Sequence, residues 1–325
     1  MKVKRILSVA LALVLVASSA AILSSCGESG KYKVGICQLV QHDALDAATK
    51  GFKDYLTEKL GDKVTFDEQN AAGETANCAT IVNQFVSSNY NLILANATPA
   101  LQAAATATET IPVVGTSITD YATALNIKDW KGSTGTNVTG SCDLAPLDQQ
   151  AAMIKEVMPN IKNVGILYCS AEANSKYQAN VISEELKKLG INSTEYTFAD
   201  SNDLQSVLQG AIKNCEALYV PTDNTVASNT GIIENICAPA KIPVFAGEEN
   251  ICKGCGVVTL SISYEDIGRK AGELAYDILV NGKKAGDLPV TFAKDLEKKV
   301  VKSRADALKI TVPEGYKEIS AEKAE

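Results

Sequence analysis

The chain has 325 residues, of which 46% are hydrophobic and 21% are charged, and its formal net charge is -7. This composition is typical of an ordinary soluble globular protein, and the acidic balance offers no basic surface to DNA or RNA. Arginine occurs only at Arg5, Arg269 and Arg304, so the bidentate clamps that many phosphate sites use are disfavoured. We therefore expect neither nucleic acid nor a polyanion as a partner.

The first 26 residues have the pattern of a secretory signal. Lys2, Lys4 and Arg5 precede an apolar run over residues 6–17, and small residues then lead to Cys26. The run is too short for a membrane-spanning helix, which needs ~20 apolar residues. The pattern favours a cleaved leader over a membrane span.

This leader resembles a bacterial lipoprotein signal. The resemblance implies that residues 1–25 are removed, that Cys26 becomes the lipid-carrying N-terminus, and that residues 26–31 form a short polar tether. We therefore expect a protein that is anchored by lipid at the extracytoplasmic face of the cell membrane.

The remaining chain, about 300 residues long, contains one pattern of elements twice. Each copy has four short apolar runs of strand type, separated by segments with helical spacing of apolar residues. The expected strands are 33–37, 64–66, 92–95 and 111–115 in the first copy, and 164–168, 195–198, 217–220 and 242–247 in the second. The expected helices are 45–60, 75–89, 181–189 and 202–214. Strands that alternate with helices predict parallel sheets of right-handed βαβ units, here in two similar lobes.

A further amphipathic helix over 265–279 and closing strands near 289–292 and 298–301 follow the second copy. The whole arrangement resembles type I periplasmic binding proteins, which have two Rossmann-like α/β lobes joined by three chain crossings. The resemblance places the crossings near Gly140-Ser141, Ser263-Tyr264 and Asp287-Pro289. It divides the chain into an N-terminal lobe (32–140 plus 265–287), a C-terminal lobe (141–264 plus 288–312) and a charged tail (313–325).

The nine cysteines are spread over a large chain rather than arranged as a small disulfide framework. Several lie in apolar runs, which favours small buried side chains. Cys252 and Cys255 form a CxxC pair that could be a local disulfide, a redox pair or half of a metal site. A second CxxC is missing and the chain has one histidine, so zinc is disfavoured and we expect no metal and no cofactor.

Ligands of open parallel sheets bind beyond the carboxyl ends of the strands, where helix N-termini also point. The expected strands place six segments there: 38–46, 96–100, 115–120, 170–175, 221–228 and 247–250. These segments contain hydroxyls, amides and carboxylates but no Lys or Arg. They suit a small zwitterion, whose ammonium pairs with Asp223 or Glu248 while its carboxylate rests on backbone N–H groups and hydroxyls. Asp223 and Thr98 could instead be helix caps.

The sequence gives no sign of catalysis. His42 is the single histidine and lies where a helix begins, with no partner serine or cysteine motif, and the usual hydrolase, zinc-protease and phosphate-loop motifs do not occur. We expect no enzymatic activity.

Several segments resemble a family of substrate-binding lipoproteins of ABC importers, and the resemblance extends over essentially the whole mature chain. The most specific segment is 219–228, and segments 35–38, 137–140, 243–250 and 260–264 belong to the same resemblance. Members are associated with uptake of amino acids, aromatic ones and tryptophan in particular. The sequence departs from the usual family pattern at Asp43, where proline is expected, and at Cys255, where glycine is expected.

The resemblance implies a monomer that binds a small ligand in a cleft and serves an ABC permease. The implied ligand-binding residues, with Ser117 added from its loop, are Gln38, Asp46, Thr98, Ser117, Glu172, Asn174, Ser175, Asp223, Asn224 and Glu248. The alternatives are an extracellular sensor for a signalling partner, a binding protein for a nucleoside or sugar, and a surface enzyme. The sequence leaves open which ligand binds, which permease is served and which role the CxxC pair has.

Overall fold

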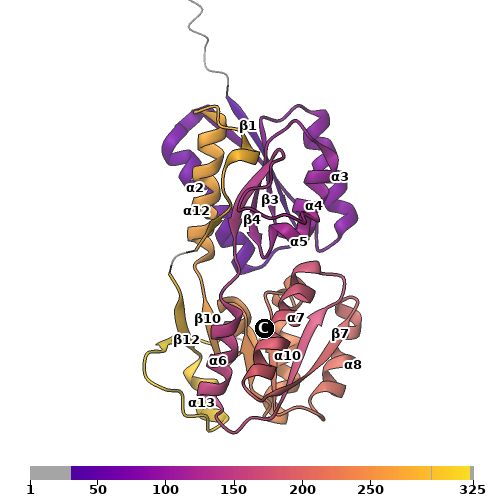
Figure 1. The fold of residues 1–325 in the computed structure, drawn as a ribbon, viewed down its shortest axis with the longest axis vertical. Helices are drawn as coiled ribbons and strands as arrows, with labels where there is room; N and C mark the ends of the chain where they lie inside the picture. Colours follow the sequence, from indigo (N-terminus) through magenta and orange to yellow (C-terminus); the bar gives the residue numbers. More distant parts are fainter. Residues whose placement is uncertain (1–30, 294, 323–325) are drawn as a thin grey trace, which may run out of the picture.

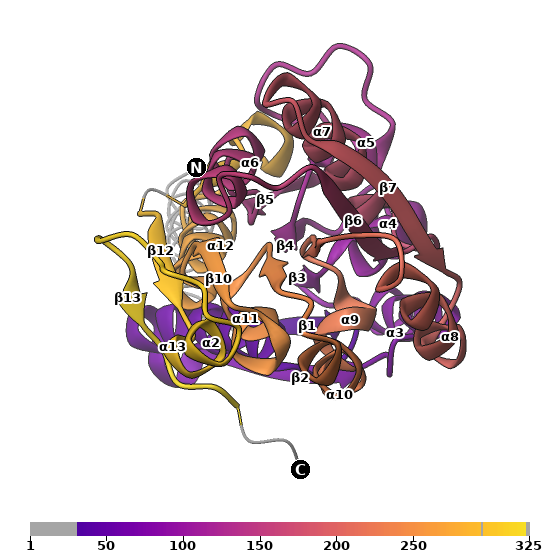
Figure 2. The same cartoon turned by 90° about the horizontal axis from the view of Figure 1, so that it is seen from below.

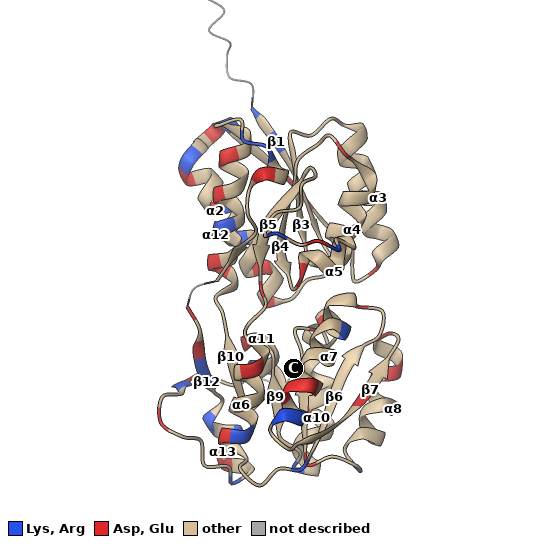
Figure 3. Cartoon of the chain, in the orientation of Figure 1, with Lys and Arg blue, Asp and Glu red and all other residues tan. Residues whose placement is uncertain are grey.

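The computed structural model describes residues 31–293 and 295–322 and contains two sheets of mainly parallel strands, one in each lobe (Figure 1). The predicted signal over residues 1–25 and the lipidation site Cys26 lie outside the described residues. No helix in the described ranges is long and apolar enough to cross a membrane. Acidic and basic residues are interspersed over both lobes in the view of Figure 3.

The sheet of the first lobe has the strand order β11-β5-β4-β3-β1-β2, and all of its pairings are parallel. Its strands are β1 (Tyr32–Gln38), β2 (Val64–Asn70), β3 (Leu92–Asn96), β4 (Val113–Ile118), β5 (Val138–Cys142) and β11 (Thr291–Phe292). Strands β3, β4 and β5 are buried along their whole length, as expected for a parallel sheet covered on both faces. The predicted βαβ repeat is confirmed in this lobe.

Helices cover both faces of this sheet. Helices α2 (Asp43–Leu60) and α12 (Tyr264–Leu279) pack on one face, whereas α3 (Thr75–Ser87) and α4 (Thr98–Ala107) pack on the other, beside the short α5 (Tyr121–Leu125). Helices α2 and α12 approach closely because glycines face the contact: a Cβ on Gly268 would lie 2.0 Å from the Ala48 carbonyl oxygen. This contact connects the start of the chain to the segment that follows the second copy of the repeat.

The sheet of the second lobe has the order β13-β12-β10-β9-β8-β6-β7, with β12 antiparallel to β10. Its strands are β6 (Asn163–Cys169), β7 (Asn192–Phe198), β8 (Ala217–Val220), β9 (Val244–Ala246), β10 (Val258–Ser261), β12 (Glu297–Val300) and β13 (Lys317–Glu318). Its helices are α6 (Leu147–Val157), α7 (Ala173–Lys188), α8 (Ser201–Ala211), α9 (Asn224–Ala227), α10 (Thr230–Ala240), α11 (Glu249–Cys255) and α13 (Lys302–Ala307). Figure 2 shows β7 and β13 at opposite edges of this lobe. Helices α6, α7 and α13 cover one face, and α8 to α11 cover the other.

The chain passes between the lobes three times, after β5, after β10 and after β11. The second passage lies next to the expected Ser263-Tyr264. The first and third lie later than the expected Gly140-Ser141 and Asp287-Pro289, because β11 runs parallel to Ser141 and Cys142 and keeps both segments in the first sheet. The tail expected over 313–325 also contributes β13, which pairs with β12.

Candidate functional site

A small cavity lies between the two lobes, at the carboxyl ends of their parallel strands. The first lobe contributes His42, Ala44, Leu45, Ser117 and Thr119, and the second contributes Asn174, Thr222, Asp223, Asn224, Ala227, Glu248 and Ile251. Asp143 lies on the first passage, and Tyr264 is the first residue of α12, directly after the second passage. The cavity volume is about 10 Å³, which is room for about one water molecule. The lobes are therefore closed on each other, and a ligand as large as an amino acid enters only if they open.

Three carboxyl groups line this cavity, those of Asp143, Asp223 and Glu248, with exposed fractions of 5%, 1% and 3%. Burial raises the pKa of Asp143 to about 6 and that of Glu248 to about 7. Burial, and next the charge of Glu172, raises the pKa of Asp223 to about 7. Because no Lys or Arg lines the cavity, a cationic group of a ligand would have no competitor for these acids.

Asp223 and Glu248 each cap a helix and also line the cavity. Asp223 Oδ1 accepts from the Val226 N–H at 2.8 Å, and its Oδ2 accepts from the Cys169 N–H at 2.7 Å. Glu248 accepts from the N–H groups of Asn250 and Ile251 at the start of α11. Their backbone partners fix both carboxylates at the cavity wall.

The sequence analysis did not predict Asp143, which connects two other residues of the cavity wall. Its carboxylate accepts from the Thr119 hydroxyl at 3.1 Å and from the Tyr264 hydroxyl at 3.0 Å. Both partners line the cavity and belong to different segments. The available signal was its position directly after β5 (Val138–Cys142), a strand that the sequence analysis did not predict.

Three polar atoms of the cavity walls are buried without a hydrogen-bond partner among the described residues: Ser117 Oγ, Asn174 Oδ1 and His42 Nδ1. Ser117 also has a left-handed backbone with φ of 56°, which is uncommon outside glycine. Buried polar atoms without partners cost free energy, and such strain gathers at binding sites. These atoms are available to the polar groups of a ligand.

Among the described residues, polar contacts between the lobes are few and long. His42 Nε2 lies 3.4 Å from Asn224 Oδ1, and the hydroxyls of Thr119 and Thr222 are 3.5 Å apart. Gln178 Nε2 donates to Thr119 Oγ1 at 3.4 Å. Because hydrogen bonds at these distances are weak, they hold the lobes together only loosely.

His42 directly precedes α2, as predicted, and burial lowers the pKa of its imidazole.

Five of the ten residues predicted to bind the ligand line the cavity: Ser117, Asn174, Asp223, Asn224 and Glu248. The other five, Gln38, Asp46, Thr98, Glu172 and Ser175, do not. Gln38 donates to Asp46 at 2.6 Å and accepts from Thr49 at 2.6 Å, within the first lobe. Thr98 is the first residue of α4, and Ser175 is buried in α7.

Glu172 binds its own lobe. It accepts from the N–H and side-chain amide of Asn224 at 3.0 and 2.6 Å, and from the N–H and hydroxyl of Thr225 at 2.9 and 2.8 Å. A further bond comes from Asn174 at 3.2 Å. Glu172 therefore fixes the start of α9 beside the start of α7. It does not line the cavity itself, but it bonds to Asn174 and Asn224, which do.

Glu172→Gln is expected to lower the free energy of unfolding by about 1.5–3 kcal/mol, because it replaces charge-assisted acceptors at buried donors. Urea unfolding measures the change. Glu184→Gln, on the exposed side of α7, is the control and should stay within about 0.5 kcal/mol. Unchanged stability with reduced ligand affinity would place Glu172 in contact with the ligand instead.

The CxxC cysteines lie in α11, in the core between the helix and its sheet. Both are buried, and burial raises the pKa of the Cys252 and Cys255 thiols. Within residues 31–293 and 295–322, no cluster of three or more His, Cys, Asp and Glu side chains is arranged to hold a metal ion. Both cysteines are therefore packed as small core side chains.

The comparison with known proteins agrees with this architecture. The family model for ABC transporter substrate binding proteins matches residues 33–324. The chain belongs to this family. It is 36% identical over 274 residues, 83% of this chain and 79% of the relative, to a tyrosine-binding protein of Clostridioides difficile (strain R20291).

Two solved structures of similar sequence differ in how closely their folds superpose on this chain. An ABC domain in complex with L-Trp from Streptococcus pneumonia is 32% identical and covers 89% of this chain and 99% of its own, with a TM-score of 0.85. The ligand-free, open structure of a substrate-binding protein with adhesive properties from Clostridium difficile is 34% identical and covers 90% and 100%, with a TM-score of 0.69. At nearly equal identity, the closed lobes of this chain superpose better on the L-Trp complex.

Proposed function

We propose that this chain is the extracytoplasmic ligand-binding component of an ABC importer and that it closes its two lobes over an aromatic amino acid. The observation that carries the proposal is the cavity completed by both lobes, with three buried acids and no Lys or Arg among the described residues that line it. The closed form, which presents both lobes in one arrangement, is then the state that a permease recognises. One chain completes the cavity, which supports action as a monomer.

The chemistry of the walls supports a zwitterion with a large apolar side chain. The acids provide partners for an ammonium, and the Ser117 hydroxyl, which has no partner among the described residues, provides a donor for a carboxylate. Ala44, Leu45, Ala227 and Ile251 offer apolar contact, and the rings of His42 and Tyr264 complete the walls. The tyrosine-binding relative and the L-Trp complex agree with an aromatic ligand.

We also propose that the chain is anchored in the cell membrane through lipid on Cys26, from the signal pattern of its first 26 residues. Cys26→Ala is expected to abolish incorporation of labelled fatty acid, because it removes the thiol to which lipid is attached. Radiolabelled palmitate in growing cells measures this. Equal labelling of the variant and the parent would contradict the anchor.

A thermal-shift screen over the twenty amino acids, nucleosides and simple sugars tests the ligand class. Aromatic amino acids are expected to stabilise the protein by RT ln(1 + [L]/Kd), about 2.7 kcal/mol at a hundredfold excess over Kd. A nucleoside or sugar as the best ligand would overturn the zwitterion. If the protein steadily consumes the ligand, it is an enzyme. If it binds the ligand but has no effect on the transport of that ligand into cells, a sensor is favoured.

A further inference from the structure

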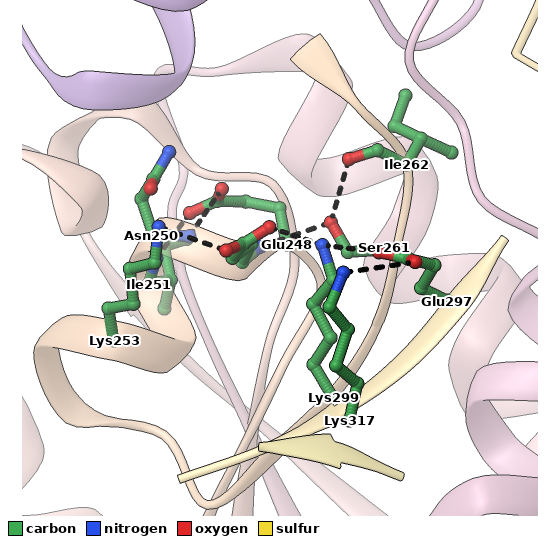
Figure 4. Close-up of polar contacts among 10 residues, drawn as sticks. Glu248, Asn250, Ile251, Lys253, Ser261, Ile262, Glu297, Lys299 and Lys317 are labelled. Atoms are coloured by element: carbon green, nitrogen blue, oxygen red, sulfur yellow. Dashed lines mark hydrogen bonds and ion pairs between the residues drawn. The ribbon is translucent and has the colours of Figure 1, made fainter. Parts of the chain in front are cut away.

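Lys299 of β12 is a basic side chain placed in a largely buried position near the passages between the lobes. Its side chain is 10% exposed, and its Nζ lies 2.5 Å from Glu249 and 3.0 Å from Glu297 (Figure 4). Removing an ammonium from water is costly unless acids pair with it closely. The two ion pairs offset the cost of keeping Lys299 in this position.

The two acids belong to segments that matter for the cavity. Glu249 begins α11 directly after Glu248, which lines the cavity. Glu297 begins β12, directly after the third passage between the lobes. Lys299 therefore ties a wall of the ligand site to a strand that leaves a passage.

A second connection joins α11 to the neighbouring passage. The N–H of Glu249 donates to Ser261 Oγ at 3.2 Å, and Ser261 Oγ donates to the Ile262 carbonyl at 3.2 Å. Ser261 ends β10, so Ile262 lies in the second passage. The beginning of α11 is thus bound to β10, which leads into the second passage, and to β12, which follows the third.

These passages in turn contact the first lobe. Ile262 packs in one apolar cluster with Ala44 and Ala48 of α2, and Leu296 of the third passage packs against the same cluster. Ala44 lines the cavity from the first lobe. A continuous set of contacts therefore runs from Lys299 through both passages to the opposite cavity wall.

We propose that Lys299 is a positioning residue that sets the balance between open and closed lobes and, through it, ligand affinity. It fixes the start of α11, with Glu248, against the two passages, so that the cavity walls meet in one arrangement when the lobes close. Apparent affinity depends on the fraction of protein that is competent to close on the ligand. This inference rests on the proposed function for its ligand readout.

The charge of Lys299 can be removed without stranding its partners. Glu249 also pairs with Lys253 at 2.9 Å, and Glu297 pairs with Lys317 at 3.4 Å. Methionine at position 299 keeps most of the apolar stem and removes only the ammonium. Lys299→Met is therefore expected to fold. Glu297→Gln, at a side chain that is 47% exposed, provides a second variant that leaves Lys299 paired with Glu249.

The test labels one exposed position in each lobe with a fluorescent pair and measures energy transfer without ligand, together with calorimetry using tyrosine and tryptophan. Lys299→Met is expected to shift the ligand-free protein toward the open form and weaken binding by about 2- to 30-fold. Lys299→Arg should restore both values. The control is Lys302→Met, which removes an ion pair with Asp306. The two side chains of this pair are 57% and 61% exposed, so the variant should change neither the energy transfer nor the affinity.

A structural role alone would lower the melting temperature of Lys299→Met while leaving energy transfer and affinity at parental values, and that result would overturn the proposal. If Lys299→Met does not fold, Glu297→Gln must show the same two shifts in the same direction, and parental values would overturn the proposal. If the parent binds no amino acid, the proposed function fails. The ligand-free energy transfer then still decides whether Lys299 controls the lobes.

Discussion

Asp143→Asn is expected to weaken binding of an aromatic amino acid by about 10- to 150-fold, the equivalent of a charge-assisted hydrogen bond of about 1.5–3 kcal/mol. Asp143 receives its two hydrogen bonds from the hydroxyls of Thr119 and Tyr264, which can turn toward other acceptors. Backbone N–H groups instead occupy both oxygens of Asp223. Asp143 therefore has more capacity to accept from a ligand ammonium.

Calorimetry with tyrosine and tryptophan measures the loss, and Asp148→Asn on the exposed side of α6 serves as the control. Asp223→Asn and Glu248→Gln should reduce stability as well as affinity, since each places an amide NH2 where a carboxylate oxygen accepts from a backbone N–H, and loss of such a charge-assisted bond costs about 1.5–3 kcal/mol. Parental affinity in Asp143→Asn, together with a lower melting temperature, would make this acid a structural link between the passages only.

Ligand affinity should rise as the pH increases from 5 to 8. In the free protein the pKa is about 6 for Asp143 and about 7 for Asp223 and Glu248, so these acids are largely protonated at pH 5 and ionised at pH 8. A ligand ammonium favours the ionised form and lowers the pKa of the acid that it contacts. Binding therefore releases protons in this window, and each unit of lowering is worth about tenfold in affinity at high pH.

Calorimetry in two buffers of different ionisation enthalpy measures the protons released. The stability of the ligand-free protein should show the opposite trend with pH. An acid whose pKa is raised in the folded state binds more protons folded than unfolded. Its contribution to the free energy of unfolding therefore falls from about pH 4 to about pH 7. Asp143→Asn should flatten part of both trends. Proton uptake on binding would contradict an ammonium at these acids.

The sequence predicts the repeated strands and helices well because each is a short apolar run or a helical pattern bounded by glycine or polar residues. The closing strand expected over 289–292 is observed as β11, but Thr291 and Phe292 are too few to show from sequence that they join the first sheet rather than the second. Their pairing with Ser141 and Cys142 decides where the chain leaves the first lobe.

The candidate site was predicted in part for a similar reason. Topology fixes where parallel strands end, and this places Ser117 and Glu248 at the cavity. Sequence alone does not tell whether a polar side chain at that edge faces the cavity or bonds within its own lobe. Gln38 and Glu172 bond within their own lobes. Asp143 lies on a passage between the lobes, which the rule for strand ends does not cover.

Small-angle X-ray scattering on protein stripped of ligand by unfolding and refolding, with and without saturating tyrosine or tryptophan, tests the central claim most directly. The cavity of about 10 Å³ admits such a ligand only when the lobes separate, so the ligand-free ensemble should include open forms. The account predicts that the radius of gyration falls on binding, because the ligand favours the form in which the lobes meet around it. A ligand that binds tightly while the radius of gyration stays constant would contradict binding between two moving lobes.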